Sequence, residues 1–103
     1  MPRPRICRRI GFRFRVNSFK PAGMPLKQLE ELQLTKDELE AVRLIDLENI
    51  EQKKAGEQMK ISQPTLSRLL TSARKKIADA LVNGKAITIR GGNYKFFKRL
   101  YFL

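Results

Sequence analysis

Residues 51–84 read EQKKAGEQMKISQPTLSRLLTSARKKIADALVNG, and this stretch decides the fold of the chain. Its pattern predicts a short helix over residues 52–59, a break at Lys60 and Ile61, and a long helix over residues 63–82. At 1.5 Å per residue, the long helix spans about 30 Å. Two helices of this kind, joined by a tight turn, are typical of a helix-turn-helix.

The ends of the long helix are marked by characteristic residues. Ser62 is a favourable N-cap, and Pro64 falls in the first turn, where its missing N–H costs nothing. Asn83 followed by Gly84 is typical of a helix C-terminus. Between these ends a single apolar stripe repeats at helical spacing, and it comprises Leu66, Leu69, Leu70, Ala73, Ile77, Ala80 and Leu81.

Another helix is expected upstream, over residues 36–48. Thr35 and Glu38 have the spacing of a capping box at its start, and Asn49 tolerates the positive φ at which many helices end. Residues 25–32, which precede this helix, are expected to form a short helical turn that carries three leucines.

The turn region also meets the packing and surface requirements of a helix-turn-helix. Ala55 and Gly56 supply the small side chains that are needed where the two helices touch. The second helix of such motifs enters the major groove with its N-terminal turns, which therefore carry short polar or basic side chains. The predicted base-reading residues are Gln63, Thr65, Ser67 and Arg68. The predicted phosphate-binding residues are Ser62, Thr71, Arg74, Lys75 and Lys76. The competing interpretation is a capped surface helix with a solvated charged face.

The two ends of the chain are predicted to be strands and basic tails. Residues 12–16 alternate apolar and basic side chains, and residues 86–90 read AITIR, so both segments predict short strands. We expect these two strands to pair beneath the helices, because neither is stable alone. Arg3 and Arg5 are expected to contact phosphates or a minor groove, with a disordered basic tail as the alternative. The aromatic and basic residues 94–103 are assigned to packing or to a dimer contact.

The charge of the chain favours a polyanionic partner. Its 103 residues include 22 Lys and Arg against 10 Asp and Glu, which gives a formal net charge of +12. Such an excess attracts polyanions. Residues 21–50 are the exception, since they hold seven acidic and three basic residues. The first helix, which lies in this acidic segment, is expected to face solvent or a protein while other parts of the domain face phosphate.

Several classes of function are disfavoured by the composition. Cys7 is the only cysteine and the chain has no histidine, so an intramolecular disulfide is impossible and zinc ligands are lacking. No convincing paired acid/base or metal constellation occurs, so we expect neither an enzyme nor a cofactor. No apolar run reaches the about 20 residues of a membrane-spanning helix, and the N-terminus does not read as a signal peptide. The expectation is a cytoplasmic protein without membrane contact.

The stretch from Leu34 to Leu81 resembles region four of bacterial sigma factors, which reads promoter DNA. The chain is more similar still to an uncharacterised prokaryotic family of small sigma-region-four-like proteins. The shared motifs are Pro2-Arg3-Pro4-Arg5, Lys20-Pro21-Ala22-Gly23 and residues 78–86. This resemblance covers residues 2–92 and implies a DNA-binding role.

Three residues depart from the usual pattern of these motifs. Lys60 occupies the turn position that is commonly glycine, and a lysine at positive φ costs about 1 kcal/mol, so a different turn type is expected. Glu51 is a poorer N-cap than serine or aspartate. Gly56 stands where alanine is common, which weakens the short helix by about 1 kcal/mol.

The sequence therefore predicts a mainly α fold: a three-helix, sigma-region-four-like helix-turn-helix with a long third helix and a small two-stranded β element from the N-terminal and C-terminal segments. Residues 1–34 form a basic arm with a strand and a loop, residues 35–84 the helix-turn-helix domain, and residues 85–103 a strand and tail. The expected function is sequence-specific DNA binding by a transcription regulator, through the helix that starts at Gln63. The alternatives are an RNA-binding basic protein and a protein-interaction module that contacts RNA polymerase or another protein. A homodimer is left open.

Overall fold

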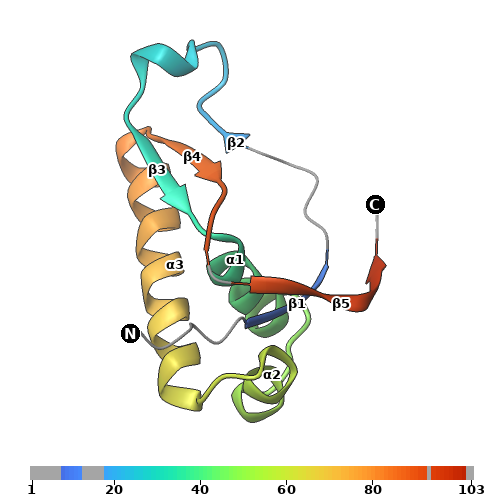
Figure 1. Ribbon diagram of the computed structural model, residues 1–103. Coiled ribbons are helices and arrows are strands. Elements are labelled where there is room, and N and C mark those ends of the chain that lie inside the picture. The colour runs from blue at the N-terminus through green and yellow to red at the C-terminus, as the bar shows by residue number, and fades with distance from the viewer. Residues whose placement is uncertain (1–7, 13–17, 93, 102–103) are drawn as a thin grey trace, which may run out of the picture.

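The computed structural model describes residues 8–12, 18–92 and 94–101. In Figure 1 helix α3 runs along one side of the molecule, strands β3 and β4 lie beside it, and α2 lies near its N-terminal end. The elements in chain order are β1 (Arg8–Phe12), β2 (Ser18–Phe19), the 3-10 turn η1 (Leu26–Gln28), β3 (Glu31–Leu34), α1 (Lys36–Val42), the π-helix η2 (Arg43–Leu47), α2 (Gln52–Met59), α3 (Gln63–Asn83), β4 (Ala86–Ile89) and β5 (Tyr94–Tyr101).

The long helix predicted from the sequence is confirmed as α3, with one additional residue at its C-terminus. Ser62 caps it by accepting a hydrogen bond from the backbone N–H of Thr65, and Gly84 ends it in the left-handed conformation at φ 66°. The predicted apolar stripe is buried or partly buried except at its end, where Leu81 is 78% exposed. Ile77 and Ala80 face the sheet. At 100° per residue, Leu81 lies at the margin of the stripe beside them and so reaches solvent.

The short helix α2 has its predicted bounds, but the expected change of turn type at Lys60 is wrong. Lys60 adopts φ 58° and ψ 47°, the left-handed conformation that glycine usually occupies. The N–H of Ile61 then donates to the carbonyl oxygen of Gly56 at 2.9 Å. A Cβ atom on Gly56 would lie 3.0 Å from the carbonyl oxygen of Ile61. Glycine at this position therefore allows the turn to close tightly over the end of α2.

The predicted helix over residues 36–48 is observed in two parts. Thr35 and Glu38 form the capping box in both directions, with N–H···O distances of 3.3 and 2.9 Å. After Val42 the helix widens into the π-helix η2, in which the N–H of Glu48 donates to the carbonyl oxygen of Arg43 at 2.9 Å. Asn49 follows at φ 57°, as expected of a residue that ends a helix.

Two apolar clusters hold the helices together and against the sheet. The first lies between α1, η2, α2 and α3, and comprises Ala41, Leu44, Ala55, Met59, Leu66 and Leu70. The second lies between α3, β3 and β4, and comprises Leu34, Ala73, Ala80, Ile87 and Ile89. Helix α3 therefore contributes one side of its surface to both clusters, which leaves its opposite side to solvent.

Strand β4 is observed where the sequence predicts it, but the predicted pairing is wrong. It lies between β2, to which it is antiparallel, and β3, to which it is parallel. The short helical turn predicted over residues 25–32 is confined to η1, and residues 31–34 form β3 instead, with Leu32 paired with Ile87 and Leu34 with Ile89. The three helices form the connection between β3 and β4, and a parallel pair needs a long connection of this kind.

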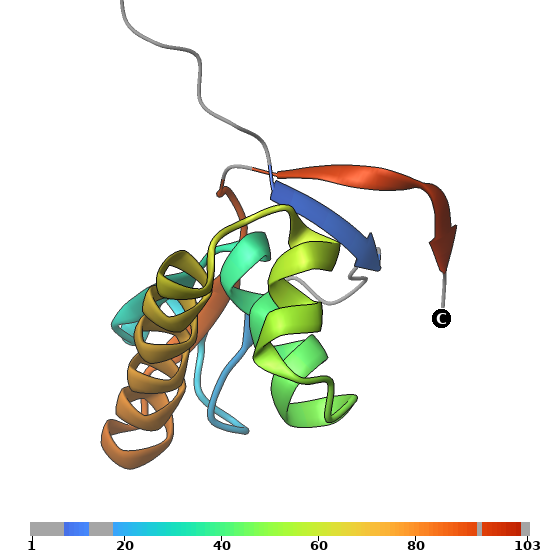
Figure 2. The same cartoon turned by 90° about the horizontal axis from the view of Figure 1, so that it is seen from below.

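The N-terminal and C-terminal segments do form a two-stranded sheet, though not with the predicted strands. Strand β1 is parallel to β5, with Arg8 opposite Tyr94 and Ile10 opposite Phe96. In Figure 2 this pair lies on the side of α1 and α2 that faces away from α3. Residues 13–17, the greater part of the predicted first strand, lie outside the described residues. Within the described part of the chain, no helix has both the length and the apolar character that crossing a membrane requires.

Candidate nucleic-acid interface

The exposed side of α3 carries most of the residues that the sequence assigned to nucleic-acid contact. Gln63, Ser67, Arg68, Thr71 and Lys75 are all exposed. The last three are separated by three and four residues, so they follow one face of the helix. Within the described residues, neither Arg68 nor Thr71 makes a hydrogen bond or an ion pair that would occupy its side chain.

Ser62 and Thr65 are arranged differently from the expectation. The Ser62 hydroxyl donates to Thr65 Oγ1 at 2.9 Å and accepts from the Thr65 N–H at 3.3 Å. Pro64 has no N–H, so the backbone N–H of Gln63 is the donor of the first turn that this cap leaves open. The hydroxyl of Ser62 is therefore used to cap α3. Thr65 is partly buried, and its hydroxyl hydrogen is still available for a hydrogen bond.

Arg74 is exposed but is held by an acidic side chain. Its Nε and Nη2 donate to the two carboxylate oxygens of Asp46, at 3.1 and 2.7 Å. The hydrogen bonds to Asp46 raise the pKa of the Arg74 guanidinium above its ordinary value. Arg74 thus reaches the surface in a fixed orientation set by η2.

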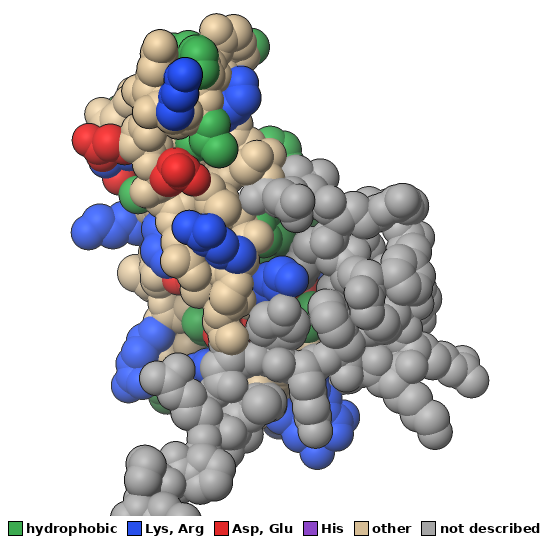
Figure 3. Space-filling view, turned by 45° about the horizontal axis from the view of Figure 1, so that its top comes forward, with side chains coloured by type: hydrophobic (Ala, Val, Ile, Leu, Met, Phe, Trp, Pro, Cys, Tyr) green, Lys and Arg blue, Asp and Glu red, His purple; other side chains and the backbone are tan. Residues whose placement is uncertain are grey.

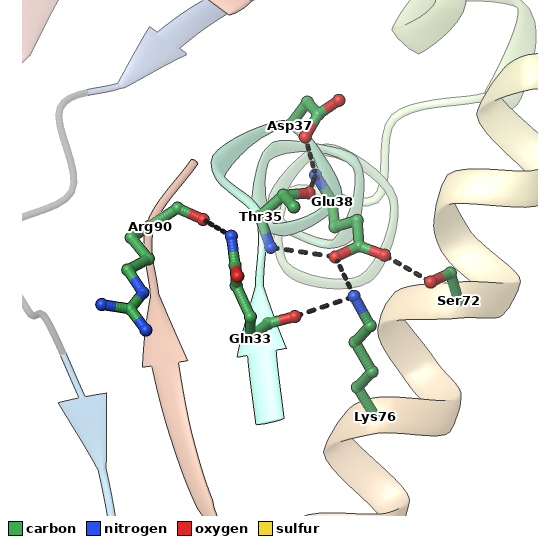
Figure 4. Close-up of polar contacts among 7 residues, drawn as sticks. All are labelled: Gln33, Thr35, Asp37, Glu38, Ser72, Lys76 and Arg90. Carbon is green, nitrogen blue, oxygen red and sulfur yellow. Dashed lines mark hydrogen bonds and ion pairs between the residues drawn. The ribbon is translucent and has the colours of Figure 1, made fainter. Parts of the chain in front are cut away.

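Lys76 is partly buried and points toward Gln33 of β3 and Glu38 of α1, as Figure 4 shows. Its ammonium donates to the carbonyl oxygen of Gln33 and to Glu38 Oε1, both at 2.8 Å. The hydroxyl of Ser72 also donates to Glu38. These bonds fasten α3 to the start of α1, so the position of Lys76 favours a structural role over the predicted phosphate contact.

The hydrogen bonds around Glu38 control its ionisation. Burial of the side chain raises the pKa, but the bonds from Lys76, Ser72 and Thr35 together outweigh burial and leave the pKa of Glu38 below its ordinary value. The carboxylate is therefore charged at neutral pH and can keep the ammonium of Lys76 in place.

The acids of α1 are turned inward, which corrects the expectation that the first helix faces solvent or a protein, whereas Glu30, Glu31, Asp46 and Glu48 of the same acidic segment are exposed. Asp37, Glu38 and Glu40 are all buried. Asp37 lies 3.3 Å from Arg8 of β1, and Glu40 accepts from the N–H of Gly11 at 2.9 Å. The reason is that buried carboxylates need partners, and the strands and helices around α1 supply them. Most of the acidic charge of this helix thus holds the fold together.

The structure adds three cations that the sequence analysis did not assign. Lys53 and Lys54 are exposed near the N-terminus of α2, and Lys60 is exposed in the turn. The rule that the first helix of a helix-turn-helix crosses the DNA backbone could have identified them. In Figure 3 Lys and Arg side chains lie along the length of the face in view, with acidic side chains beside them in its upper part.

Two of the predicted phosphate-binding residues, Arg3 and Arg5, lie outside the described residues. Within the described part of the chain, no three Cys, Asp or Glu side chains are grouped so that they could hold a metal ion. The candidate interface therefore consists of the exposed side of α3 with the lysines of α2 and the turn.

Comparison with known proteins gives one family. Residues 1–97 match the family described as "Protein of unknown function DUF134". A UPF0251 protein of Caldanaerobacter subterraneus subsp. tengcongensis is 57% identical over 97 residues, which cover 94% of this chain and 82% of the relative. A UPF0251 protein of Moorella thermoacetica is 56% identical over 94 residues, which cover 91% of this chain and 63% of the relative. No solved structure matches the chain significantly.

Proposed function

The chain belongs to the DUF134 family, and from the geometry of α2 and α3 we propose that it binds duplex DNA in a sequence-specific way and acts as a transcription regulator. The observation that carries this proposal is the exposed N-terminal half of α3, with Gln63, Ser67 and Arg68 at the surface, together with the two exposed lysines of α2. We further propose that α1, η2, α2 and α3 correspond to the helices of a sigma-region-four-like domain.

The proposed mode of binding places the start of α3 in the major groove. Arg68 has donors for the O6 and N7 atoms of guanine, and Gln63 can pair with an adenine edge. Lys75 lies seven residues beyond Arg68, which is about 10 Å along the helix axis. At that distance from the base-reading turns it is suited to a phosphate, and a phosphate contact fixes position and carries no sequence information.

Helix α2 supports the same docking. Lys53 and Lys54 are exposed at its N-terminal end, where the first helix of a helix-turn-helix meets the DNA backbone. The formal charge of +12 adds a long-range attraction to any duplex. Asp37, Glu38 and Glu40 are buried in internal contacts, so the acids of α1 offer less support for a protein-interaction module than the sequence alone suggests.

The test separates base reading from phosphate binding. The full chain is used to select fragments from random duplex DNA, and the selected and scrambled duplexes are then compared by fluorescence anisotropy. We expect Arg68→Ala to reduce the ratio of specific to scrambled affinity about tenfold, since a bidentate base contact is worth about 1–3 kcal/mol. Lys75→Ala should weaken both duplexes by the same factor.

Glu57→Gln is the control for loss of a charge at an exposed residue of α2 to which no DNA contact is assigned. Equal affinity of the wild-type chain for every duplex, unchanged by Arg68→Ala, would contradict sequence-specific reading. Tighter binding to single-stranded RNA than to duplex DNA at matched salt would favour the RNA-binding alternative.

A further inference from the structure

We propose that Asp46 is a positioning residue of the DNA interface, which fixes the Arg74 guanidinium so that its outer edge can receive a DNA phosphate. This inference rests on the proposed function and extends it to a residue outside the helix-turn-helix. Asp46 belongs to η2, 28 residues before Arg74, and its own negative charge would otherwise repel DNA.

The contact between the two side chains leaves part of the guanidinium available. Nε and Nη2 donate to the two carboxylate oxygens of Asp46, so one edge of the planar group is occupied. Within the described residues, Nη1 has no hydrogen-bond partner, and the side chain of Arg74 is 52% exposed. A guanidinium has five N–H donors, and such a fork binds phosphate with defined geometry.

The π-helix η2 places Asp46 where its carboxylate can reach the guanidinium of Arg74. In η2 the backbone bond from Glu48 to Arg43 spans five residues, which widens the turn that carries Asp46. Arg43 braces this turn from within, since it binds Glu40 at 2.7 Å and lies 3.6 Å from Glu48.

Arg74 also continues a row of predicted contact residues along α3. It follows Ser67 by seven residues, which is two helical turns, so both side chains lie on the same side of the helix. Gln63 precedes Ser67 by one turn and begins this row. The row thus begins at the base-reading turns and ends at Arg74, about 10 Å farther along the helix axis. At that position Arg74 is suited to contact the DNA phosphate backbone at the edge of the major groove.

A fixed arginine binds phosphate more tightly than a mobile one. Ordering a long side chain on binding costs free energy, and a side chain that is already ordered avoids most of that cost. Loss of Asp46 should therefore weaken duplex binding, although it removes a negative charge near the DNA. A simple charge effect has the opposite sign, so the direction of the change distinguishes the two explanations.

The experiment measures duplex affinity by fluorescence anisotropy at several salt concentrations for Asp46→Ala, Arg74→Ala, Arg74→Lys and the Asp46→Ala/Arg74→Ala double variant. We expect about threefold weaker binding for Asp46→Ala and for Arg74→Lys, which keeps the charge but loses the fork. Arg74→Ala should also reduce the salt slope by about one. In the double variant, loss of Asp46 should have no further effect.

Arg68→Ala and unfolding midpoints in urea serve as controls for DNA binding and for folding. Unchanged or tighter binding by Asp46→Ala, with Arg68→Ala still weakened, would overturn the role of Asp46 and leave the proposed function in place. Weakening by Asp46→Ala that persists on the Arg74→Ala background would overturn it too. If the wild-type chain binds no duplex, the proposed function and this inference both fail.

Discussion

Glu40 is the most deeply buried charged side chain of the described residues, with 1% of its surface exposed. It accepts hydrogen bonds from the backbone N–H of Gly11 and from Nε and Nη2 of Arg43. A buried carboxylate loses its hydration, so three donors of this kind are what make its burial tolerable. The hydrogen bond from Gly11 to Glu40 attaches β1 to α1, and the Glu40 side chain is itself held by Arg43.

We expect Glu40→Ala to lower the free energy of unfolding by about 3 kcal/mol, because it leaves the half-buried guanidinium of Arg43 without its main partner. Urea denaturation followed by circular dichroism measures the change. Glu48→Ala is the matched control, since Glu48 also pairs with Arg43 but is 48% exposed. An exposed pair is worth about 0.5 kcal/mol. Equal effects of the two substitutions would show that burial does not determine the strength of these contacts.

At the scale of the elements, the turn between α2 and α3 retains its left-handed residue even though that residue is a lysine. Lys60 has φ 58°, and the bond from Ile61 to Gly56 closes over it. The packing of Met59 and Leu66 in one buried cluster fixes the angle between the two helices. The favourable free energy of that packing exceeds the strain energy of the left-handed backbone at Lys60. The turn therefore keeps the usual left-handed geometry.

Replacement of Lys60 by glycine should relieve that strain and raise the free energy of unfolding by about 1 kcal/mol. The measurement is again urea denaturation. Lys60→Ala removes the same charge but keeps a side chain at positive φ, so it should give no comparable gain. If both variants are equally stable, removal of the lysine charge rather than backbone strain accounts for the change.

For the whole molecule, the positive and negative charges have different locations. The buried acids of α1 bind Arg8, Arg43 and Lys76 inside the fold. Arg68 and Lys75 remain on the exposed side of α3. Among the described residues, the cations that pair with the buried acids are therefore partly buried, whereas Arg68 and Lys75 are available to attract a polyanion.

Two neighbouring lysines test this division of charge. Lys76→Ala should lower the free energy of unfolding by about 2 kcal/mol, because Glu38 is left buried without its ammonium partner. Lys75→Ala should change stability by about 0.5 kcal/mol or less, while it reduces the salt slope of duplex binding by about one. Denaturation and salt-dependent anisotropy measure the two effects. A stability loss for Lys75→Ala as large as that for Lys76→Ala would contradict the division.

Much of the helical framework could be predicted from the sequence, because it depends on neighbouring residues. The Thr35–Glu38 capping box, the Ser62 cap, the stop at Gly84 and the apolar stripe of α3 are all local signals, and each is observed. The exposed placement of Gln63, Ser67 and Arg68 follows from the same helical period. Their role in DNA reading stays a prediction.

The pairing of strands and the pairing of charged side chains could not be predicted from such local signals. Which strand lies beside β4, and whether Asp37 and Glu38 face water or Arg8 and Lys76, depends on segments that are far apart in the chain. The sequence by itself determined where helices begin and end, because capping and periodicity act within a few residues. Only the tertiary structure decided which cations are held inside and which are left at the surface, because contacts between distant segments determine the environment of each charge.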